Sequence, residues 1–216
     1  MNPASISHHL DDATLLAYAA GTLPEAFDLM VATHLSLCDV CRAAAGAFDV
    51  LGAAVTLDDA PCAQMDAGSL QSVIAHLPDM QARPLRAKPA GIIPAPLQDY
   101  IGGNLDAVRW RPIGMGVKQA ILKTSGTATA RLLSIPAGAA MPDHGHHGTE
   151  MTMVLDGAFR DEDAYFARGD VEIADSDVHH TPIADIGADC ICLAVTDAPL
   201  QFDGVLARIW QKIIRI

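Results

Sequence analysis

Basic side chains are scarce in this chain of 216 residues, which has 14 Lys and Arg against 26 Asp and Glu and a formal net charge of −12. This excess of negative charge argues against nucleic acid or an anionic membrane as a direct partner. Cysteine is scarce as well, and the five thiols are a Cys38-x-x-Cys41 pair, Cys62 and a Cys190-x-Cys192 pair. Such an arrangement is no disulfide framework, so a reducing compartment is favoured.

Long apolar runs are also lacking. No stretch of about 18 apolar residues predicts a membrane span, and residues 1–12 have neither the basic flank nor the apolar core of a signal peptide. We therefore expect a cytoplasmic protein. Half of the residues are apolar, and the length allows one large domain or two small ones with a buried core.

The N-terminal third has helical periodicity and helix-capping residues. A first helix follows Asp11, a second is expected to be capped at Thr22 or Leu23, a third follows Cys41, and a fourth is expected to be capped by Asp66. The apolar stripe of the fourth helix is Leu70, Val73, Ile74 and Leu77. We expect these four helices to form a small bundle.

His34, Cys38 and Cys41 have the spacing of metal ligands at a helix–turn–helix corner. Two thiolates and an imidazole favour a tetrahedral Zn²⁺ over the hard cations, and His8 or His9 could supply the fourth ligand. Alternatively, the cysteines are small buried residues and His34 caps a helix, or the two thiols form a redox pair. We expect zinc, because a metal stabilises a helical unit with a modest core.

From about residue 100 onward the pattern changes to short strands separated by glycine-containing turns. Residues 128–135, 151–155, 171–173 and 191–195 are the clearest strands, and their regular spacing predicts a β-sandwich or barrel. Residues 205–216 have helical spacing, which is typical of a closing helix on the barrel, with a membrane-surface helix as the alternative.

The proline-spaced segment 78–98 separates these two patterns. It indicates an interdomain linker, or instead a loop laid across the second domain. We place a helical domain at residues 1–85, a proline-rich linker at 86–99 and a second domain at 100–216.

His144, His146 and Glu150 form a second set of possible metal ligands. Alternate positions of an extended chain point to the same face, and Glu150 has the matching parity. Two imidazoles and a carboxylate inside a small barrel would hold Zn²⁺ or another divalent metal. In the alternative, the histidines simply lie on loops and bind no metal.

Gly138-x5-His144-Gly-His146-x3-Glu150-x6-Gly157 resembles the first motif of the cupins, which are antiparallel β jelly-roll barrels. A degenerate second motif is Gly169-x5-Asp175-x-Asp177-x2-His180, with Ala184 in place of the usual Asn. Its register implies His180, and not His179, as the fourth ligand of the cupin site. His147 and His179 are assigned to the surface or to the surroundings of the metal.

The spacing His9-x24-His34-x3-Cys38-x2-Cys41 resembles the motif of the zinc-binding anti-sigma domain, and its register favours His9 over His8. With the cupin that follows, the chain resembles the ChrR type of anti-sigma factor. This resemblance implies an α + β protein of two domains, a zinc-pinned four-helix bundle and a cupin. It also implies a heterodimer with an extracytoplasmic-function (group IV) sigma factor, bound through the N-terminal domain.

We therefore expect a zinc-dependent anti-sigma factor, not an enzyme, whose cupin domain senses oxidative stress such as singlet oxygen and releases the sigma factor. Residues 1–85 have 10 Asp and Glu against 2 Lys and Arg, a net charge of −8, which suits a basic partner or is ordinary solubilising acidity. The alternative function is a metal-dependent cupin dioxygenase acting on a small diketone-like substrate. Cys190 and Cys192 are either core residues or oxidisable thiols near the metal.

Overall fold

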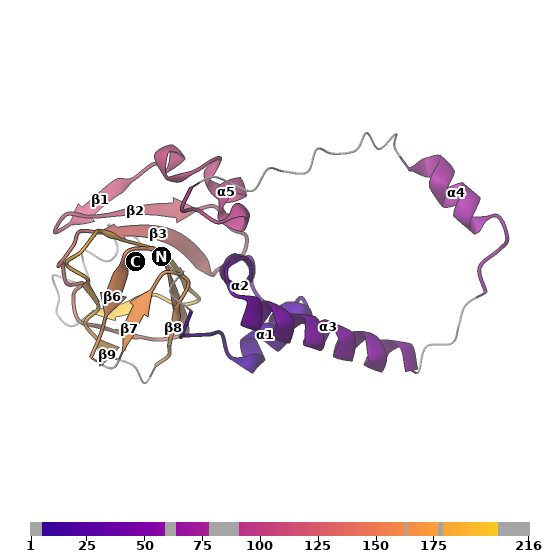
Figure 1. Ribbon diagram of the computed structural model, residues 1–216, viewed down its shortest axis with the longest axis horizontal. Coiled ribbons are helices and arrows are strands. Elements are labelled where there is room, and N and C mark those ends of the chain that lie inside the picture. The colour runs from indigo at the N-terminus through magenta and orange to yellow at the C-terminus, as the bar shows by residue number, and fades with distance from the viewer. Residues whose placement is uncertain (1–5, 59–63, 78–90, 163, 177–178, 203–216) are drawn as a thin grey trace.

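The computed structural model describes residues 6–58, 64–77, 91–162, 164–176 and 179–202, and combines N-terminal helices with antiparallel sheets (Figure 1). The helices are α1 (Asp12–Ala19), α2 (Glu25–Leu35), α3 (Asp39–Asp58), α4 (Ser69–His76) and α5 (Ala95–Ile101), followed by a 3-10 turn at Leu105–Ala107. The predicted fold class is confirmed in this form. The expected closing helix at 205–216 lies outside the described residues, as does Cys62.

The first two helices begin for local reasons that the sequence shows. The Asp11 side chain accepts a hydrogen bond from the Thr14 amide at 2.6 Å, and a left-handed Gly21 (φ 65°) follows α1. The expected cap of α2 at Thr22 or Leu23 is wrong by one or two residues. Pro24 is the N-cap, because its own carbonyl accepts the first helical hydrogen bonds.

Helix α2 lies at the centre of the molecule. Seven of its 11 residues are buried, and it contacts α1 and α3 on one side and α5 and the strands β3, β5 and β11 on others. Phe27, Met30 and Val31 therefore belong to a core that also contains sheet residues such as Leu193 and Val195. The helices and one face of the large sheet thus share a hydrophobic core.

Helix α4 differs from the expected fourth member of a bundle. It begins at Ser69, after Gly68, and the predicted cap Asp66 makes no side-chain cap bond to it. No residue of α4 is buried, and Figure 1 shows it standing apart from α1–α3 and from the sheets. The apolar stripe of this amphipathic helix therefore stays exposed in the described part of the chain.

Helix α5 lies within the stretch in which the sequence indicated a linker. Pro94 precedes its first residue, and Gly102 ends it with a left-handed conformation (φ 77°). Leu97 and Ile93 are completely or almost completely buried, and α5 packs against α2. Residues 91–101 thus fix the N-terminal helices to the β half, an arrangement that the proline spacing alone did not indicate.

The β half is a set of antiparallel sheets. Its largest sheet has six strands in the order β1-β2-β3-β11-β5-β8, and two three-stranded sheets have the orders β10-β6-β7 and β12-β4-β9. The strands are β1 (Arg111–Gly114), β2 (Val117–Leu122), β3 (Thr129–Ile135), β4 (His144–His146), β5 (Glu150–Asp156), β6 (Ala158–Arg160), β7 (Tyr165–Ala167), β8 (Val171–Ala174), β9 (His179–His180), β10 (Ile183–Ala184), β11 (Cys190–Thr196) and β12 (Leu200–Phe202).

Strand β11 is buried at every position, which explains why its sequence is apolar throughout. Successive side chains point to opposite faces of the sheet. Leu193 and Val195 face the core shared with the helices, whereas Cys190, Cys192 and Ala194 face a second core inside the barrel. A single layer of sheet therefore separates the helical half from the barrel interior.

Helix α3 is long and apolar enough to cross a membrane over Asp39–Leu57, by length and composition only. It is not a continuous apolar run of the kind that the sequence was expected to show for a span, because Asp39, Arg42 and Asp49 interrupt it. Its first turns belong to the helical core, because Cys41 and Ala45 are buried there. Its second half extends away from α1 and α2 (Figure 1). The large apolar side chains there, such as Val50 and Val55, are exposed.

Candidate metal centres

The four side chains predicted for the N-terminal site come together in the structure. The ligand atoms of His9, His34, Cys38 and Cys41 all lie within 4.8 Å of one another. The Nδ1 atom of His9 is 3.3 Å from the Cys38 sulfur and 3.5 Å from the Cys41 sulfur. His8 points away from them, with its ring against Phe166 at a centroid distance of 4.4 Å. The structure thus places His9, and not His8, at the sulfur atoms.

The corner between α2 and α3 explains how residues of the two helices converge. His34 lies in the last turn of α2, and the amide of Cys38 donates to its carbonyl at 2.8 Å, which turns the chain back. Cys38 directly precedes α3, and Cys41 lies in the first turn of that helix. The Cys41 amide donates to the Cys38 sulfur at 3.4 Å, which is the bond expected where a thiolate precedes a helix N-terminus.

His34 is prepared to act as a ligand through one particular nitrogen. Its Nδ1 atom lies 3.0 Å from the carbonyl oxygen of Gly169, to which it donates a proton. Burial lowers the pKa of His34, and the Gly169 bond opposes this shift only in part. The ring is therefore neutral, and its Nε2 atom is a buried acceptor with no hydrogen-bond partner among the described residues. A buried, unsatisfied lone pair of this kind is costly unless a ligand is present.

The surroundings of the two thiols also favour the binding of a cation between them. Burial first, and then the neighbouring Cys38 and the charge of Asp12, raise the pKa of Cys41 to about 11, although a hydrogen bond from the backbone of Leu10 opposes the rise. A bound metal would favour the thiolates that this environment otherwise disfavours. The donor set of two sulfurs and two imidazoles, closely grouped, fits Zn²⁺.

The second predicted site lies in a cavity inside the barrel. The rings of His144 and His180 face each other across the paired strands β4 and β9, with centroids 4.7 Å apart, and each residue is 5% exposed. Glu150 lines the same cavity. His146 is in β4 as predicted, but its side chain lies outside the described part of the structure. Three of the four predicted ligands are thus shown to share one cavity.

Two acidic residues beside His180 were not predicted. Nδ1 of His180 lies 2.9 Å from Oε1 of Glu172 and 3.9 Å from Oδ2 of Asp161. Burial alone would lower the pKa of His180, but the bond and charge of Glu172, followed by Glu150 and Asp161, raise it overall. A carboxylate that holds Nδ1–H leaves Nε2 for a metal. The available sequence signal was a charged residue inside the apolar strand Val171–Ala174.

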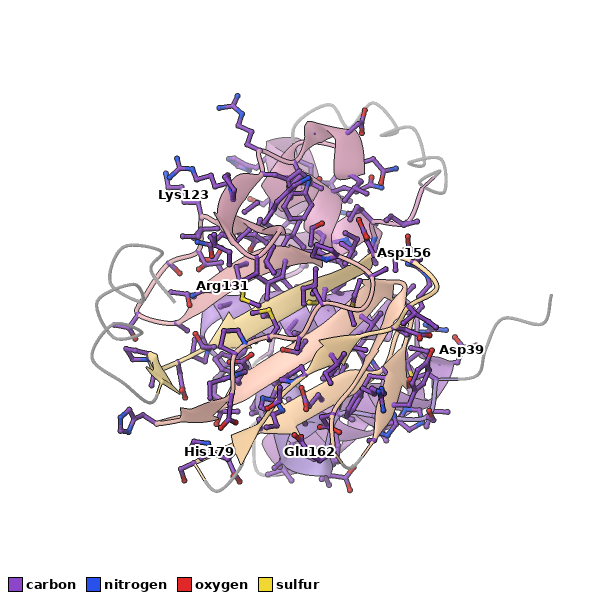
Figure 2. The ribbon with its side chains drawn as sticks, turned by 90° about the vertical axis from the view of Figure 1, so that its left-hand side faces the viewer. Asp39, Lys123, Arg131, Asp156, Glu162 and His179 are labelled. Atoms are coloured by element: carbon purple, nitrogen blue, oxygen red, sulfur yellow. The ribbon has the colours of Figure 1, made fainter. Side chains whose placement is uncertain are left out.

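Arg131 was also missed, although it lines the same cavity (Figure 2). It is only 5% exposed, and its guanidinium donates to Gln119 at 3.3 Å and to Thr129 at 3.2 Å. Burial lowers the pKa of Arg131, and the charge of Glu150 opposes this. The sequence signal was an arginine within a largely apolar strand. A cation that is buried in such a strand needs polar partners, which points to a site.

The remaining residues that the sequence singled out have simpler positions. His147 and His179 are exposed, and Nδ1 of His179 is 3.9 Å from Asp143 (Figure 2). Cys190 and Cys192 are buried free thiols, and Cys192 lines the cavity. The hydrogen bond with Cys190 and burial raise the pKa of Cys192, so this thiol is protonated. Both cysteines are core residues, and one of them also borders the candidate metal site.

Comparison with known proteins places the chain in a family. The sequence model of the ChrR cupin-like domain matches residues 98–199. The anti-sigma-E factor ChrR of Cereibacter sphaeroides is 57% identical over 213 residues, which cover 98% of this chain and 100% of that protein.

One solved structure agrees with that assignment. In the crystal structure of Rhodobacter sphaeroides SigE in complex with the anti-sigma ChrR, a chain 56% identical to this one superposes with a TM-score of 0.77, covering 89% of this chain and 100% of that one. An RmlC-like cupin from Ralstonia eutropha is 27% identical with a TM-score of 0.40 over 44% of this chain, and carries no weight for function. On its full-length identity to an anti-sigma factor, the chain belongs to the ChrR family of anti-sigma factors.

Proposed function

We propose that this protein binds an extracytoplasmic-function sigma factor through its N-terminal helices. Binding would keep the sigma factor inactive by masking the surfaces that it uses for RNA polymerase and promoter DNA. The proposal rests on the relative of 57% identity, which is an anti-sigma-E factor, and on the related chain crystallised with SigE. The family is regulatory, so no catalytic activity is proposed, and the dioxygenase alternative is set aside.

The structural observation that carries the proposal is an exposed apolar surface on α3 and α4. Seven large apolar side chains in the second half of α3 and in α4, and Leu77 directly after α4, are between 55% and 72% exposed: Val50, Leu51, Val55, Leu57, Leu70, Val73, Ile74 and Leu77. So much apolar surface on consecutive elements marks a protein interface. The net charge of −8 over residues 1–85 would steer a basic partner towards it.

Zinc at the N-terminal site would join three segments of the chain. His9 precedes α1, His34 lies in the last turn of α2, and Cys38 and Cys41 lie directly before and in the first turn of α3. Zinc supplies a cross-link there and adds its binding free energy to folding. Because His34, Cys38 and Cys41 lie on both sides of the corner between α2 and α3, holding them together fixes the angle between these helices. That angle determines the direction in which the exposed half of α3 projects.

The β half is proposed as the sensor. His144, His146, Glu150 and His180 would hold Zn²⁺ or another divalent metal in the cavity, and oxidative stress such as singlet oxygen would change this site and release the sigma factor. We keep the boundaries of an anti-sigma domain at 1–85, a linker at 86–99 and a cupin domain at 100–216, and we place the protein in the cytoplasm. A signal acts if it changes the relative free energies of the bound and free states.

Co-expression with group IV sigma factors of the same genome, followed by co-purification and metal analysis, tests the proposal. We expect one sigma factor to co-purify in equal amount, with zinc bound. A fragment of residues 1–85 should still inhibit that sigma factor but should not respond to the stress, and it should melt earlier, because it lacks α5 and β11, which cover α2. The proposal fails if no sigma factor is retained, and the boundaries fail if inhibition requires residues beyond 100.

A further inference from the structure

Residues 6–8 lie along the turn between β7 and β8 of the cupin half. The amides of Ser7 and His8 donate to Oδ1 of Asp170 at 2.7 and 2.9 Å, and the amide of Val171 donates to the carbonyl of His8 at 3.2 Å. Burial raises the pKa of Asp170, but the amides of Ala167, His8 and Ser7 together bring it below its usual value. The N-terminal segment is therefore bound to an ionised carboxylate of the other half of the chain.

Gly169, the neighbour of Asp170 in this turn, makes two further contacts with the helical half. Its backbone has φ 92°, and a Cβ atom at this position would lie 2.6 Å from the Cδ1 atom of Ile6, so a larger residue would displace Ile6. Its carbonyl accepts the Nδ1 proton of His34 at 3.0 Å. The turn thus touches a ligand of the N-terminal cluster directly, across 135 residues of sequence.

We propose that the Gly169–Asp170 turn of the cupin half is part of the N-terminal metal site and positions two of its four ligands. Gly169 orients the ring of His34, and Asp170 holds the backbone that leads directly into His9. The inference rests on the proposed zinc at this site. Groups that orient metal ligands change metal affinity without touching the metal. The N-terminal site is then built from both halves of the chain.

The same turn leads into the candidate sensor cavity. Asp170 is followed by β8, where Glu172 accepts the hydrogen bond of His180. Only Val171 separates the carboxylate that holds the N-terminal segment from the one that holds His180. A shift of β8 after a change in the cavity would therefore move the groups that orient His34 and His9. By linkage, zinc at the N-terminal site would in turn stabilise this position of β8.

The variant Asp170→Asn in the full-length protein tests the proposal. The Asn side chain has the same size, but one of its two polar groups is an NH₂ donor. This group must face a backbone N–H that donates a hydrogen bond to the carboxylate in the wild type, so that bond is lost. Asp189→Asn is the matched control, because Asp189 also accepts a backbone amide in the cupin half, that of Ala137 at 3.0 Å. The readout is thiolate-to-metal absorption after loading with Co²⁺, titrated with a chelator, because this signal requires metal bound to sulfur.

We expect Asp170→Asn to lose the Co²⁺ signal at a chelator concentration about 10- to 100-fold lower than the wild type, the usual effect of removing an orienting group. Asp189→Asn should match the wild type. If Asp170→Asn is not recovered folded, Ser7→Pro removes one donor from the N-terminal segment and leaves every cupin residue intact. The proposal is overturned if the folded variant holds Co²⁺ as tightly as the wild type.

The proposed zinc site and the positioning turn fail in different ways. A wild-type protein that gives no thiolate absorption with Co²⁺ would refute the metal site and with it this inference. A wild type with the absorption and a loss in the Cys38→Ser, Cys41→Ser double variant, but no effect of Asp170→Asn, would keep the metal site and refute the role of the turn.

Discussion

The exposed apolar surface of α3 gives a prediction whose size follows from the structure. Leu51 and Val55 are one helical turn apart, so they lie on the same face of α3, and they are 55% and 69% exposed. Complete burial of a Leu or Val side chain contributes about 1.5–3 kcal/mol, and more than half of each remains available here. Because alanine keeps the Cβ atom, the double change Leu51→Ala, Val55→Ala should weaken binding by about 2 kcal/mol.

A change of about 2 kcal/mol corresponds to a roughly 30-fold higher dissociation constant for the sigma factor. Since both side chains are exposed in the free protein, its thermal unfolding should hardly change. The assay is a binding titration with the purified sigma factor, accompanied by a melting curve. Ile186→Ala is the matched control, because Ile186 is 86% exposed but lies in the cupin half.

The outcome that refutes this reasoning is a double variant that binds as tightly as the wild type and melts at the same temperature. The exposed half of α3 would then lie outside the interface, and its apolar character would need another explanation. A variant that melts much earlier would instead show that these side chains are covered in the free protein, contrary to the exposures in the structure.

Three further predictions concern the metal sites and the contact between the halves. The double variant Cys38→Ser, Cys41→Ser should lose N-terminal zinc and sigma binding together, as measured by metal analysis and co-purification, because the metal stabilises the corner of the helices. The double variant His144→Ala, His146→Ala should still repress in unstressed cells but should not release the sigma factor under singlet oxygen, as measured with a reporter gene. Full induction in this variant would remove the cavity from sensing. Glu25, the first residue of α2, accepts hydrogen bonds from the amide of Ser125, between β2 and β3, and from the hydroxyl of Tyr100 in α5. The bonds from Ser125 and then Tyr100 lower the pKa of Glu25 from 4.5 to about 2, so its contribution to stability is present above pH 4.5 and is lost as the pH falls towards 2. Acid unfolding of Glu25→Gln should therefore lack this component, and an unchanged pH profile would contradict the role of the contact.

The sequence indicated those parts of the sites that depend on local spacing. The interval from His34 to Cys41 corresponds to a helix end, a tight turn and a new helix start, so its ligands must converge wherever the corner lies. The alternate positions of His144 and His146 in β4 follow from the geometry of any strand. Such predictions need no knowledge of tertiary contacts.

The sequence could not indicate contacts between distant segments. The approach of Gly169 to His34 joins residues 135 positions apart, and it depends on how α2 packs against the sheet. The burial of Arg131 and Glu172 depends in the same way on closure of the barrel, which turns a strand face into a cavity wall. Helix α4 shows the converse: its apolar stripe was visible in the sequence, but none of its residues is buried by the described part of the chain.

The shared core gives the cavity and the helices a common wall. Cys192 and Ala194 of β11 face the barrel interior, whereas Leu193 and Val195 between and beside them face α2. Because protein interiors are closely packed, a displacement of β11 or β8 on the cavity side has to be taken up on the helical side. The helix that receives it is α2, which carries His34 and determines the corner from which α3 projects. A change around the cavity metal would therefore reach the sigma-binding helices through packed side chains and the Gly169–Asp170 turn, without any movement of the linker between the halves.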